Sequence, residues 1–198
     1  MVALALWLVA GLVGAEKRTI VFFGDSLTAG LGVDLDDAFP AVIQRKLDEA
    51  GRPWRVVNAG LSGETTAGGL RRLDWILRQP VDILVLELGG NDGLRGIPPE
   101  SSRANLQAMI ERIRAKQPHV TVVLAGMQIP TNLGPEYTRQ FAAMYPELAE
   151  KYHAPLISFL LEGVGGVASL NQADGIHPTA EGHRRIAETV WKTIKELL

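Results

Sequence analysis

One serine, one histidine and one aspartate stand where together they could form a nucleophilic site. Ser26 lies in the segment GDSLTAG at residues 24–30, directly after a short apolar run. Asp174 and His177 lie in the segment DGIHP, just before the last helical pattern of the chain. A histidine can remove the proton of a serine hydroxyl near neutral pH, and a carboxylate can hold the imidazole in the required tautomer. We therefore predict that Ser26 is a nucleophile, His177 its base and Asp174 the partner of His177.

Each of these short motifs also has a purely structural interpretation. Ser26 could cap a helix, because serine is a preferred N-cap residue. The DGIHP segment could be a helix entry with Pro178 in the first turn. A phosphate-binding loop is disfavoured, because no lysine follows Gly30 as such a loop requires.

The other three histidines are poorer candidates for the base. His119 and His153 each lie just before a predicted strand, which places them at the edge of the sheet opposite to Ser26. His183 falls within the last helical pattern and is expected beside the core. Ligands of open α/β sheets bind outside the carboxyl ends of the strands, and only His177 belongs to a polar loop that can reach that edge.

Acyl transfer also needs hydrogen-bond donors fixed where negative charge develops on the attacked carbonyl oxygen. The backbone N–H groups of Ser26 and Gly60 and the side-chain amide of Asn91 follow three predicted strands and could be neighbours. Gly60 and Asn91 could each be an ordinary turn residue when considered alone. Because all these residue types occur together at strand ends, we predict a hydrolytic site with these three donors as its oxyanion hole.

The composition excludes several other classes of function. The chain has 198 residues, 46% of them hydrophobic and 21% charged, which predicts one globular domain. Its 20 Lys and Arg against 22 Asp and Glu give a net charge of -2, so a nucleic-acid partner is not expected. The absence of cysteine excludes thiolate nucleophiles, disulfides and Cys-ligated zinc, and any nucleophile must be an oxygen or a nitrogen.

Short apolar runs alternate with helical patterns and predict the elements that position these residues. The strands are expected at residues 19–23, 55–58, 82–88, 120–125 and 156–159, each of the type found in buried parallel strands. Five helices with apolar stripes follow them, one with Pro40 in its first turn and one capped by Thr65 or Thr66. We predict an α/β fold of three layers, with helices on both faces of a five-stranded parallel sheet.

The first residues form a separate segment. Residues 2–14 are uncharged and too few to cross a hydrocarbon core of about 30 Å as a helix, which is typical of a secretory signal sequence. We predict a signal peptide at residues 1–15, cleaved after Ala15, and a hydrolase domain at residues 16–198. No Lys or Arg precedes the apolar run, so an uncleaved anchor or a buried first helix is the alternative.

Four ordered segments together resemble a known family. GDSLTAG, NAGLSGET, GGNDG and DGIHP, which contain Ser26, Gly60, Asn91 and the pair Asp174 and His177, are similar to the four blocks of the GDSL or SGNH hydrolases. Further segments at 127–130, 132–138 and 145–149 resemble the bacterial arylesterase, acyl-CoA thioesterase I and lysophospholipase L1 branch. The resemblance implies a flavodoxin-like sheet, the catalytic and oxyanion roles named above, no metal or organic cofactor, and a periplasmic or secreted location.

The substrate is predicted from the loops after the third and fourth strands. Apolar side chains in these loops would favour an acyl chain over a sugar, for which Trp and Tyr platforms are expected. The candidate substrate-binding residues are Asp25, Gly93, Leu94, Ile97, Ile129 and Leu133.

Three functions follow in order of preference. The first is hydrolysis of small-molecule acyl esters or thioesters through an acyl-enzyme. The second is carbohydrate O-deacetylation, and the third is a non-catalytic binding module. No stable membrane span is expected after loss of the leader, and a monomer is the default expectation.

Overall fold

The computed structural model describes residues 17–198. The predicted signal peptide at residues 1–15 lies outside the described residues. No helix within the described part is long and apolar enough to cross a membrane.

The centre of the molecule is a five-stranded parallel sheet, as predicted. Its spatial order is β2-β1-β3-β4-β5. The strands are β1 (Arg18–Gly24), β2 (Trp54–Asn58), β3 (Ile83–Glu87), β4 (Thr121–Ala125) and β5 (Leu156–Ile157). Because every residue of β3 is buried, helices must cover both faces of the sheet.

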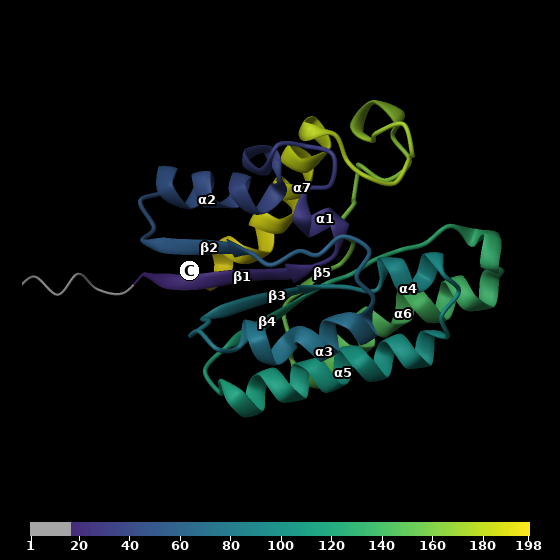
Figure 1. Cartoon of the computed structure of the whole chain (residues 1–198), viewed down its shortest axis with the longest axis horizontal. Helices are drawn as coiled ribbons and strands as arrows, with labels where there is room; N and C mark the ends of the chain where they lie inside the picture. Colours follow the sequence, from purple (N-terminus) through teal and green to yellow (C-terminus); the bar gives the residue numbers. More distant parts are fainter. Residues whose placement is uncertain (1–16) are drawn as a thin grey trace, which may run out of the picture.

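Helices form the two outer layers (Figure 1). They are α1 (Ser26–Ala29), α2 (Phe39–Glu49), α3 (Thr66–Ile76), α4 (Gly90–Leu94), α5 (Pro99–Lys116), α6 (Pro135–Tyr152) and α7 (Ala180–Ile194). Helices α2 and α7 pack together on one face, whereas α3, α5 and α6 cover the other. Short 3-10 turns lie at Leu35–Asp37, Thr131–Leu133, Ala168–Leu170 and Lys195–Leu197. The three-layer α/β/α architecture is therefore confirmed.

Local sequence signals account for the ends of several helices. Pro40 lies in the first turn of α2, where its missing N–H costs no hydrogen bond. Thr65 is the N-cap of α3, and its side chain accepts a hydrogen bond from the Gly68 N–H. The short helices α1 and α4 were not predicted, since four or five residues are too few to show a helical period.

Two strands end earlier than predicted, and the other strand bounds lie within one residue of the prediction. β3 ends at Glu87 and not at 88, and β5 has only two residues where 156–159 was predicted. Beyond Ile157 the chain turns back, and the Leu160 N–H donates to the Gly126 carbonyl at 2.9 Å. Gly126 allows this turn, because a Cβ there would lie 2.3 Å from the Ser158 oxygen. Phe159 consequently leaves the sheet and becomes available to the pocket described below.

The strand order places the polar loops at one point. Strand β1 pairs with both β2 and β3, and Gly24 at its carboxyl end lies opposite Glu87. The chain order reverses between β1 and β3, which is where open α/β sheets form a ligand crevice. The loops that follow β1 and β3 carry Ser26 and Asn91, so both residues border this crevice.

Candidate active site

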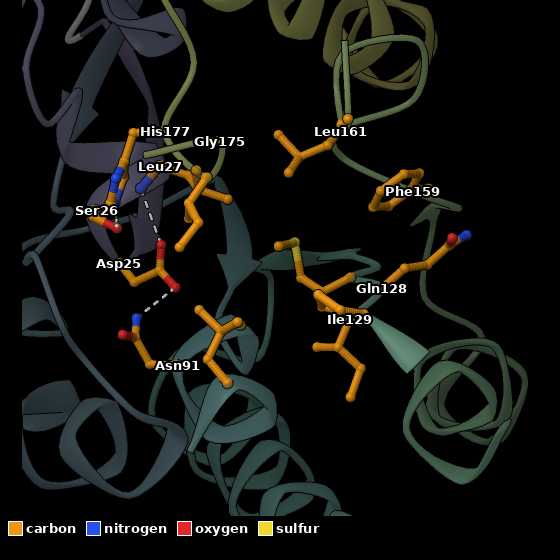
Figure 2. Close-up of a pocket in the computed structure, with 17 residues that line it drawn as sticks. Asp25, Ser26, Leu27, Asn91, Gln128, Ile129, Phe159, Leu161, Gly175 and His177 are labelled. Atoms are coloured by element: carbon orange, nitrogen blue, oxygen red, sulfur yellow. Dashed lines mark hydrogen bonds between the residues drawn. The ribbon is translucent and has the colours of Figure 1, made fainter. Parts of the chain in front are cut away.

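Ser26, His177 and Asp174 form a continuous hydrogen-bonded chain, of which Figure 2 shows Ser26 and His177. The Ser26 Oγ lies 2.9 Å from His177 Nε2. The other ring nitrogen, Nδ1, lies 2.6 Å from Asp174 Oδ2. This is the geometry in which a histidine can accept the serine proton while a carboxylate orients its ring. The three residues predicted from the sequence are thus brought together across 151 positions of the chain.

Ser26 is held at the start of a short helix. It is the first residue of α1, and the preceding Asp25 is the N-cap, whose side chain accepts from the Leu27 N–H. Gly30 ends α1 with φ of 78°, a left-handed conformation that a side chain would disfavour. The N–H groups of a first helical turn have no partner within the helix, so the Ser26 N–H can donate a hydrogen bond to an oxygen of a bound substrate.

The loop that carries Asp174 and His177 is ordered by its own backbone. Asp174 Oδ1 accepts hydrogen bonds from the Ile176 and His177 N–H groups at 2.9 and 3.0 Å. These bonds, together with the one to the His177 ring, hold the pKa of Asp174 well below its usual range. Asp174 is therefore ionised at neutral pH and can favour the tautomer that leaves Nε2 free to accept a proton.

Asn91 is oriented toward the same crevice by Asp25. The Asn91 Nδ2 group donates to Asp25 Oδ2 at 3.0 Å, and Figure 2 shows both side chains below Ser26. An amide nitrogen carries two hydrogens, so the second one remains for an oxyanion. Asn91 lines the pocket that also contains Ser26 and His177, as an oxyanion donor must.

Buried polar contacts fix the short helix that carries Asn91. The neighbouring Asp92 is buried and accepts from the Thr66 N–H at 2.8 Å, from the Thr66 hydroxyl at 2.5 Å and from the Ser102 hydroxyl at 3.0 Å. These bonds attach α4 to the starts of α3 and α5. The sequence analysis did not identify this role, because it depends on partners that are far apart in the chain.

Gly60 lies beside α1 but does not line the pocket around Ser26. A Cβ on Gly60 would lie 2.2 Å from the Ala29 nitrogen, so only glycine permits this close approach. Its N–H donates to Asn58 Oδ1 at 3.0 Å, and the Asn58 amide donates to the Thr28 carbonyl at 2.8 Å. The loop after β2 is therefore anchored against α1, and the predicted role of Gly60 as an oxyanion donor stays a prediction.

Arg72 links the ends of the two strands that precede Ser26 and Gly60. Its guanidinium donates to the Ala59 carbonyl at 2.8 Å and to the Gly24 carbonyl at 3.3 Å. It also pairs with the buried Glu64 and lies over the Phe23 ring, 4.3 Å from the centroid. This single cation thus connects the carboxyl ends of β1 and β2.

Removal of the Asn91 amide is expected to slow catalysis without weakening substrate binding. Asn91→Ala should lower kcat by about 10²- to 10³-fold, because a lost oxyanion donor acts on the transition state. The measurement is steady-state hydrolysis of a p-nitrophenyl ester. The exposed Asn132, in the loop after β4, provides the control Asn132→Ala. An unchanged kcat in Asn91→Ala would remove this residue from the hole.

The ionised form of the buried Asp25 lowers the stability of the folded protein. Its side chain is 2% exposed, and burial raises its pKa to about 6, while the Leu27 N–H and the Asn91 amide act in the opposite direction. The folded state thus holds a proton more tightly than the unfolded chain, and stability falls as pH rises from about 4 to about 6. At neutral pH the charged form costs up to about 3 kcal/mol.

Asp25→Asn is therefore expected to stabilise the folded protein and to lower its catalytic rate. The free energy of unfolding at pH 7 should rise, since no charge remains to be buried. The new amide would face the Asn91 amide, so Asn91 must turn, and kcat should fall by on the order of 10²-fold. Denaturant unfolding and ester hydrolysis at pH 7 measure the two effects, with Asp34→Asn as an exposed control. Lower stability with unchanged kcat would contradict both steps.

A cavity of about 530 Å³ opens beside Ser26. Its wall is mostly apolar and comes from the segments that follow β1, β3, β4 and β5, including the loop before α7. Figure 2 shows Phe159 and Leu161 across the cavity from Ser26 and Asp25, with Ile129 below them on the same side. The lining residues are Asp25, Ser26, Leu27, Gly90, Asn91, Leu94, Met127, Gln128, Ile129, Pro130, Phe159, Leu161, Gly165, Gly166, Gly175, Ile176 and His177.

Three of the six predicted substrate residues line this cavity, namely Asp25, Leu94 and Ile129. The structure does not place Gly93, Ile97 or Leu133 on its wall. Gly93 lies on the buried side of α4, where a Cβ would be 2.4 Å from the Ile129 side chain.

Ile97 and Leu133 lie beyond the pocket for local reasons. The Ile97 carbonyl accepts from the Tyr137 hydroxyl at 2.6 Å, which holds this segment against α6. Leu133 lies in a 3-10 turn near Gly96, with 42% of its surface exposed. The prediction failed here because a loop position does not specify which side of the loop faces the pocket.

Most of the missed lining residues follow β4 and β5. The rule that ligands bind at the carboxyl ends of strands would have included Phe159 and Leu161, but only the loops after the third and fourth strands were considered.

The remaining histidines lie elsewhere, as predicted. His183 is buried beside Phe39, and burial lowers its pKa to about 4.

The parallel sheet with helices on both faces defines an α/β protein. Its site is of the serine-hydrolase type, because it joins Ser26, His177 and Asp174 by hydrogen bonds. The family model described as "GDSL-like Lipase/Acylhydrolase family" matches residues 22–185. The chain belongs to this family, and the resemblance inferred from the four sequence segments is confirmed.

The similar proteins cover nearly the whole chain. Esterase TesA of Pseudomonas aeruginosa is 44% identical over 185 residues, which is 93% of this chain and 91% of that protein. Thioesterase 1/protease 1/lysophospholipase L1 of Escherichia coli strain K12 is 36% identical over 186 residues, 93% and 86% of the two chains. The crystal structure of psychrotrophic esterase EstA from Pseudoalteromonas sp., inhibited by monoethylphosphonate, matches at a TM-score of 0.86 and 32% identity, covering 91% and 98%.

Proposed function

We propose that the protein hydrolyses carboxylic esters and thioesters of acyl substrates through a covalent acyl-enzyme. The observation that carries this proposal is the hydrogen-bonded chain from Asp174 through His177 to Ser26, at the mouth of a mostly apolar cavity. These three hydrogen-bonded residues supply a nucleophile with its base, and the cavity can hold the acyl group of a substrate against that nucleophile.

Acylation begins when Ser26 Oγ attacks the carbonyl carbon of the substrate. His177 Nε2 takes the hydroxyl proton as the new C–O bond forms, and the carbonyl electron pair moves onto oxygen. We assign the binding of this oxyanion to the Asn91 amide and the Ser26 N–H, with the Gly60 N–H as a third candidate donor. When the tetrahedral intermediate collapses, the alkoxide or thiolate leaves and takes the proton from His177.

Deacylation repeats these steps with water. His177 removes a proton from water, whose oxygen attacks the acyl carbon and forms a second tetrahedral intermediate. The bond to Ser26 then breaks, the acid is released, and the proton returns to Ser26 Oγ.

The names of the relatives support this reaction class. They include an esterase and a thioesterase that is also named a lysophospholipase. The structure of EstA is described as inhibited by monoethylphosphonate, and phosphonates resemble the tetrahedral intermediate of acyl transfer. A fluorophosphonate probe should accordingly label Ser26, which would also reject the alternative of a non-catalytic binding module.

The cavity favours an acyl chain over a sugar ring. Phe159 is its only aromatic side chain within the described residues, and no Trp or Tyr forms a platform for a sugar there. Leu27, Leu94, Met127 and Ile129 are aliphatic or flexible side chains that suit a hydrocarbon. Carbohydrate O-deacetylation is therefore the weaker alternative.

The decisive experiment is a panel of p-nitrophenyl esters of increasing acyl length, run beside acyl thioesters and acetylated xylan. Acyl substrates should be turned over, with kcat/KM rising above that for acetate as the chain fills the cavity. Release of acetate from xylan at a rate above that for any acyl ester would overturn the assignment in favour of deacetylation.

We also propose that residues 1–15 direct export and are removed by cleavage after Ala15, and that the protein acts as a monomer. The apolar residues 2–14 followed by Ala15 support export. The presence of all three residues of the hydrogen-bonded chain in one polypeptide supports a monomer. N-terminal sequencing of exported protein and sedimentation measurements test the two statements, and an intact Met1 or a stable dimer would contradict them.

A further inference from the structure

Glu87 is a buried acid directly beneath the nucleophile. It is the last residue of β3, has no exposed surface and lies opposite Gly24 of β1. The mechanism above does not use it. A carboxyl group in such a position requires a physical explanation, because burial of an unpaired charge is costly.

The Glu87 carboxyl contacts the residues on either side of Ser26. Its Oε2 accepts a hydrogen bond from the Asp25 N–H at 3.1 Å. The same oxygen lies 2.7 Å from the Thr28 hydroxyl. Glu87 thus spans the turn in which Ser26 stands, although it touches neither Ser26 nor the cavity.

The close fit of this carboxyl accounts for glycine at position 24. A Cβ on Gly24 would lie 2.3 Å from Glu87 Oε2 and 2.2 Å from the Thr28 hydroxyl oxygen. Both distances are far below van der Waals contact. The carboxyl therefore occupies the space that a side chain at position 24 would need.

The surroundings of Glu87 do not favour a negative charge. The titratable groups that interact with it are the Asp25 carboxyl and the Tyr145 hydroxyl. The nearby Arg72 is paired with Glu64, and no cation within residues 17–198 forms an ion pair with Glu87. The second oxygen, Oε1, is buried without a hydrogen-bond partner among the described residues.

We propose that Glu87 is a neutral carboxylic acid that positions the Ser26 turn by holding Asp25 and Thr28. Its Oε2–H donates to the Thr28 hydroxyl, while the same oxygen accepts from the Asp25 N–H. The unpartnered Oε1 is then a carbonyl oxygen, which is less costly to bury than half of a carboxylate. Burial, reinforced by the charge of Asp25, raises the pKa of Glu87 well above its usual range, in agreement with this geometry.

The inference rests on the proposed function only for its effect on kcat. The protonation of Glu87 is a separate statement and has a separate readout. Protein labelled with ¹³C at the Glu carboxyls should show, at pH 7, one carboxyl signal of a protonated acid. This signal should be lost in Glu87→Gln and retained in the exposed control Glu49→Gln. A Glu87 signal of an ionised carboxylate at pH 7 would overturn the neutral acid whether or not the protein is an esterase.

Two variants test the positioning role. In Glu87→Gln the amide oxygen can accept from the Asp25 N–H, and the Thr28 hydroxyl can rotate so that it donates to the same oxygen. Both contacts are therefore kept, and kcat should stay within about threefold of the native value. Glu87→Ala removes both contacts, and kcat should fall by on the order of 10- to 10²-fold with little change in KM, because a displaced nucleophile affects the chemical step. Equal losses in the two variants, or an unchanged kcat in Glu87→Ala, would overturn the positioning role.

The pH dependence of stability provides a readout that does not depend on activity. Because the folded state retains the Glu87 proton where the unfolded chain loses it, Glu87 contributes stability at low pH that is lost as pH rises. Glu87→Gln lacks this contribution, because an amide does not titrate. The stability of the native protein relative to Glu87→Gln should therefore decline between acidic and alkaline pH, and a constant difference would contradict a neutral acid.

Discussion

Replacement of Ser26 by Ala is expected to lower ester hydrolysis by on the order of 10⁶-fold, as expected for removal of a serine nucleophile that acts with its base as a unit. Without the hydroxyl, no acyl-enzyme can form, and only the oxyanion donors and the cavity could assist attack by water. The melting temperature should change little, because within residues 17–198 the Ser26 side chain makes a single hydrogen bond, to His177.

Ser62→Ala is the matched control for this result. Ser62 is exposed and lies in the loop after β2, at the same edge of the sheet. It should hydrolyse p-nitrophenyl esters at the native rate and react normally with a fluorophosphonate. If Ser26→Ala retained a substantial part of the native turnover, a different nucleophile would be responsible and the proposed mechanism would be wrong.

Asp174→Asn is expected to lower kcat at neutral pH by about 10⁴-fold with little effect on the fold. The amide oxygen can still accept the Ile176 and His177 N–H groups, so the loop keeps its backbone contacts. The amide nitrogen would then face His177 Nδ1 and donate to it. This contact favours the tautomer with the proton on Nε2, which cannot remove the proton of Ser26.

The rate of fluorophosphonate labelling separates this effect from a loss of structure. Labelling of Ser26 needs the base, so it should slow in parallel with kcat, while the circular dichroism spectrum and the melting temperature stay close to native. Asp36→Asn makes the same change of charge on an exposed residue and should leave labelling unaffected. Fast labelling in Asp174→Asn would show that the carboxylate does not control the tautomer of His177.

These variants distinguish two kinds of contribution around one catalytic centre. Ser26 and Asp174 belong to the hydrogen-bonded chain in which, by the proposed mechanism, His177 accepts the Ser26 proton. Asp25 and Glu87 act on residues next to that chain and carry the cost of buried carboxyl groups. Stability gained in Asp25→Asn at the expense of kcat would show that part of the folding energy is given up for the orientation of Asn91.

The elements could be predicted from the sequence because they depend on local patterns, and local patterns also indicate the candidate nucleophilic residues. Apolar runs of five or so residues identify buried parallel strands, and Ser26, Asn91 and His177 follow such runs or precede a helix with a recognisable start. The five strands appear within one residue of the predicted bounds, apart from the end of β5, which comes two residues earlier. The positions of the reactive residues therefore follow from their own neighbours in the chain.

Prediction of the pocket wall was less successful, and the reason is geometric. Leu94 and Ile129 were predicted as lining residues and line the cavity, whereas Ile97 and Leu133 in the same two loops do not. Composition shows that a loop carries apolar residues, but the side that faces the pocket is set by contacts such as the one between Tyr137 and the Ile97 carbonyl. Phe159 was assigned to a strand, and only the turn at Gly126 directs it to the cavity.

The sequence by itself determined the fold class, the family and the three residues that can carry the chemistry, because strand period, helix caps and short motifs are encoded by residues close together in the chain. Only the tertiary structure decided that Asp25 orients Asn91 and that Glu87 supports the turn of Ser26. These pairs lie 66 and 62 positions apart and meet because β1 and β3 are paired in one particular register. Such contacts depend on strand order and packing, which no local pattern specifies.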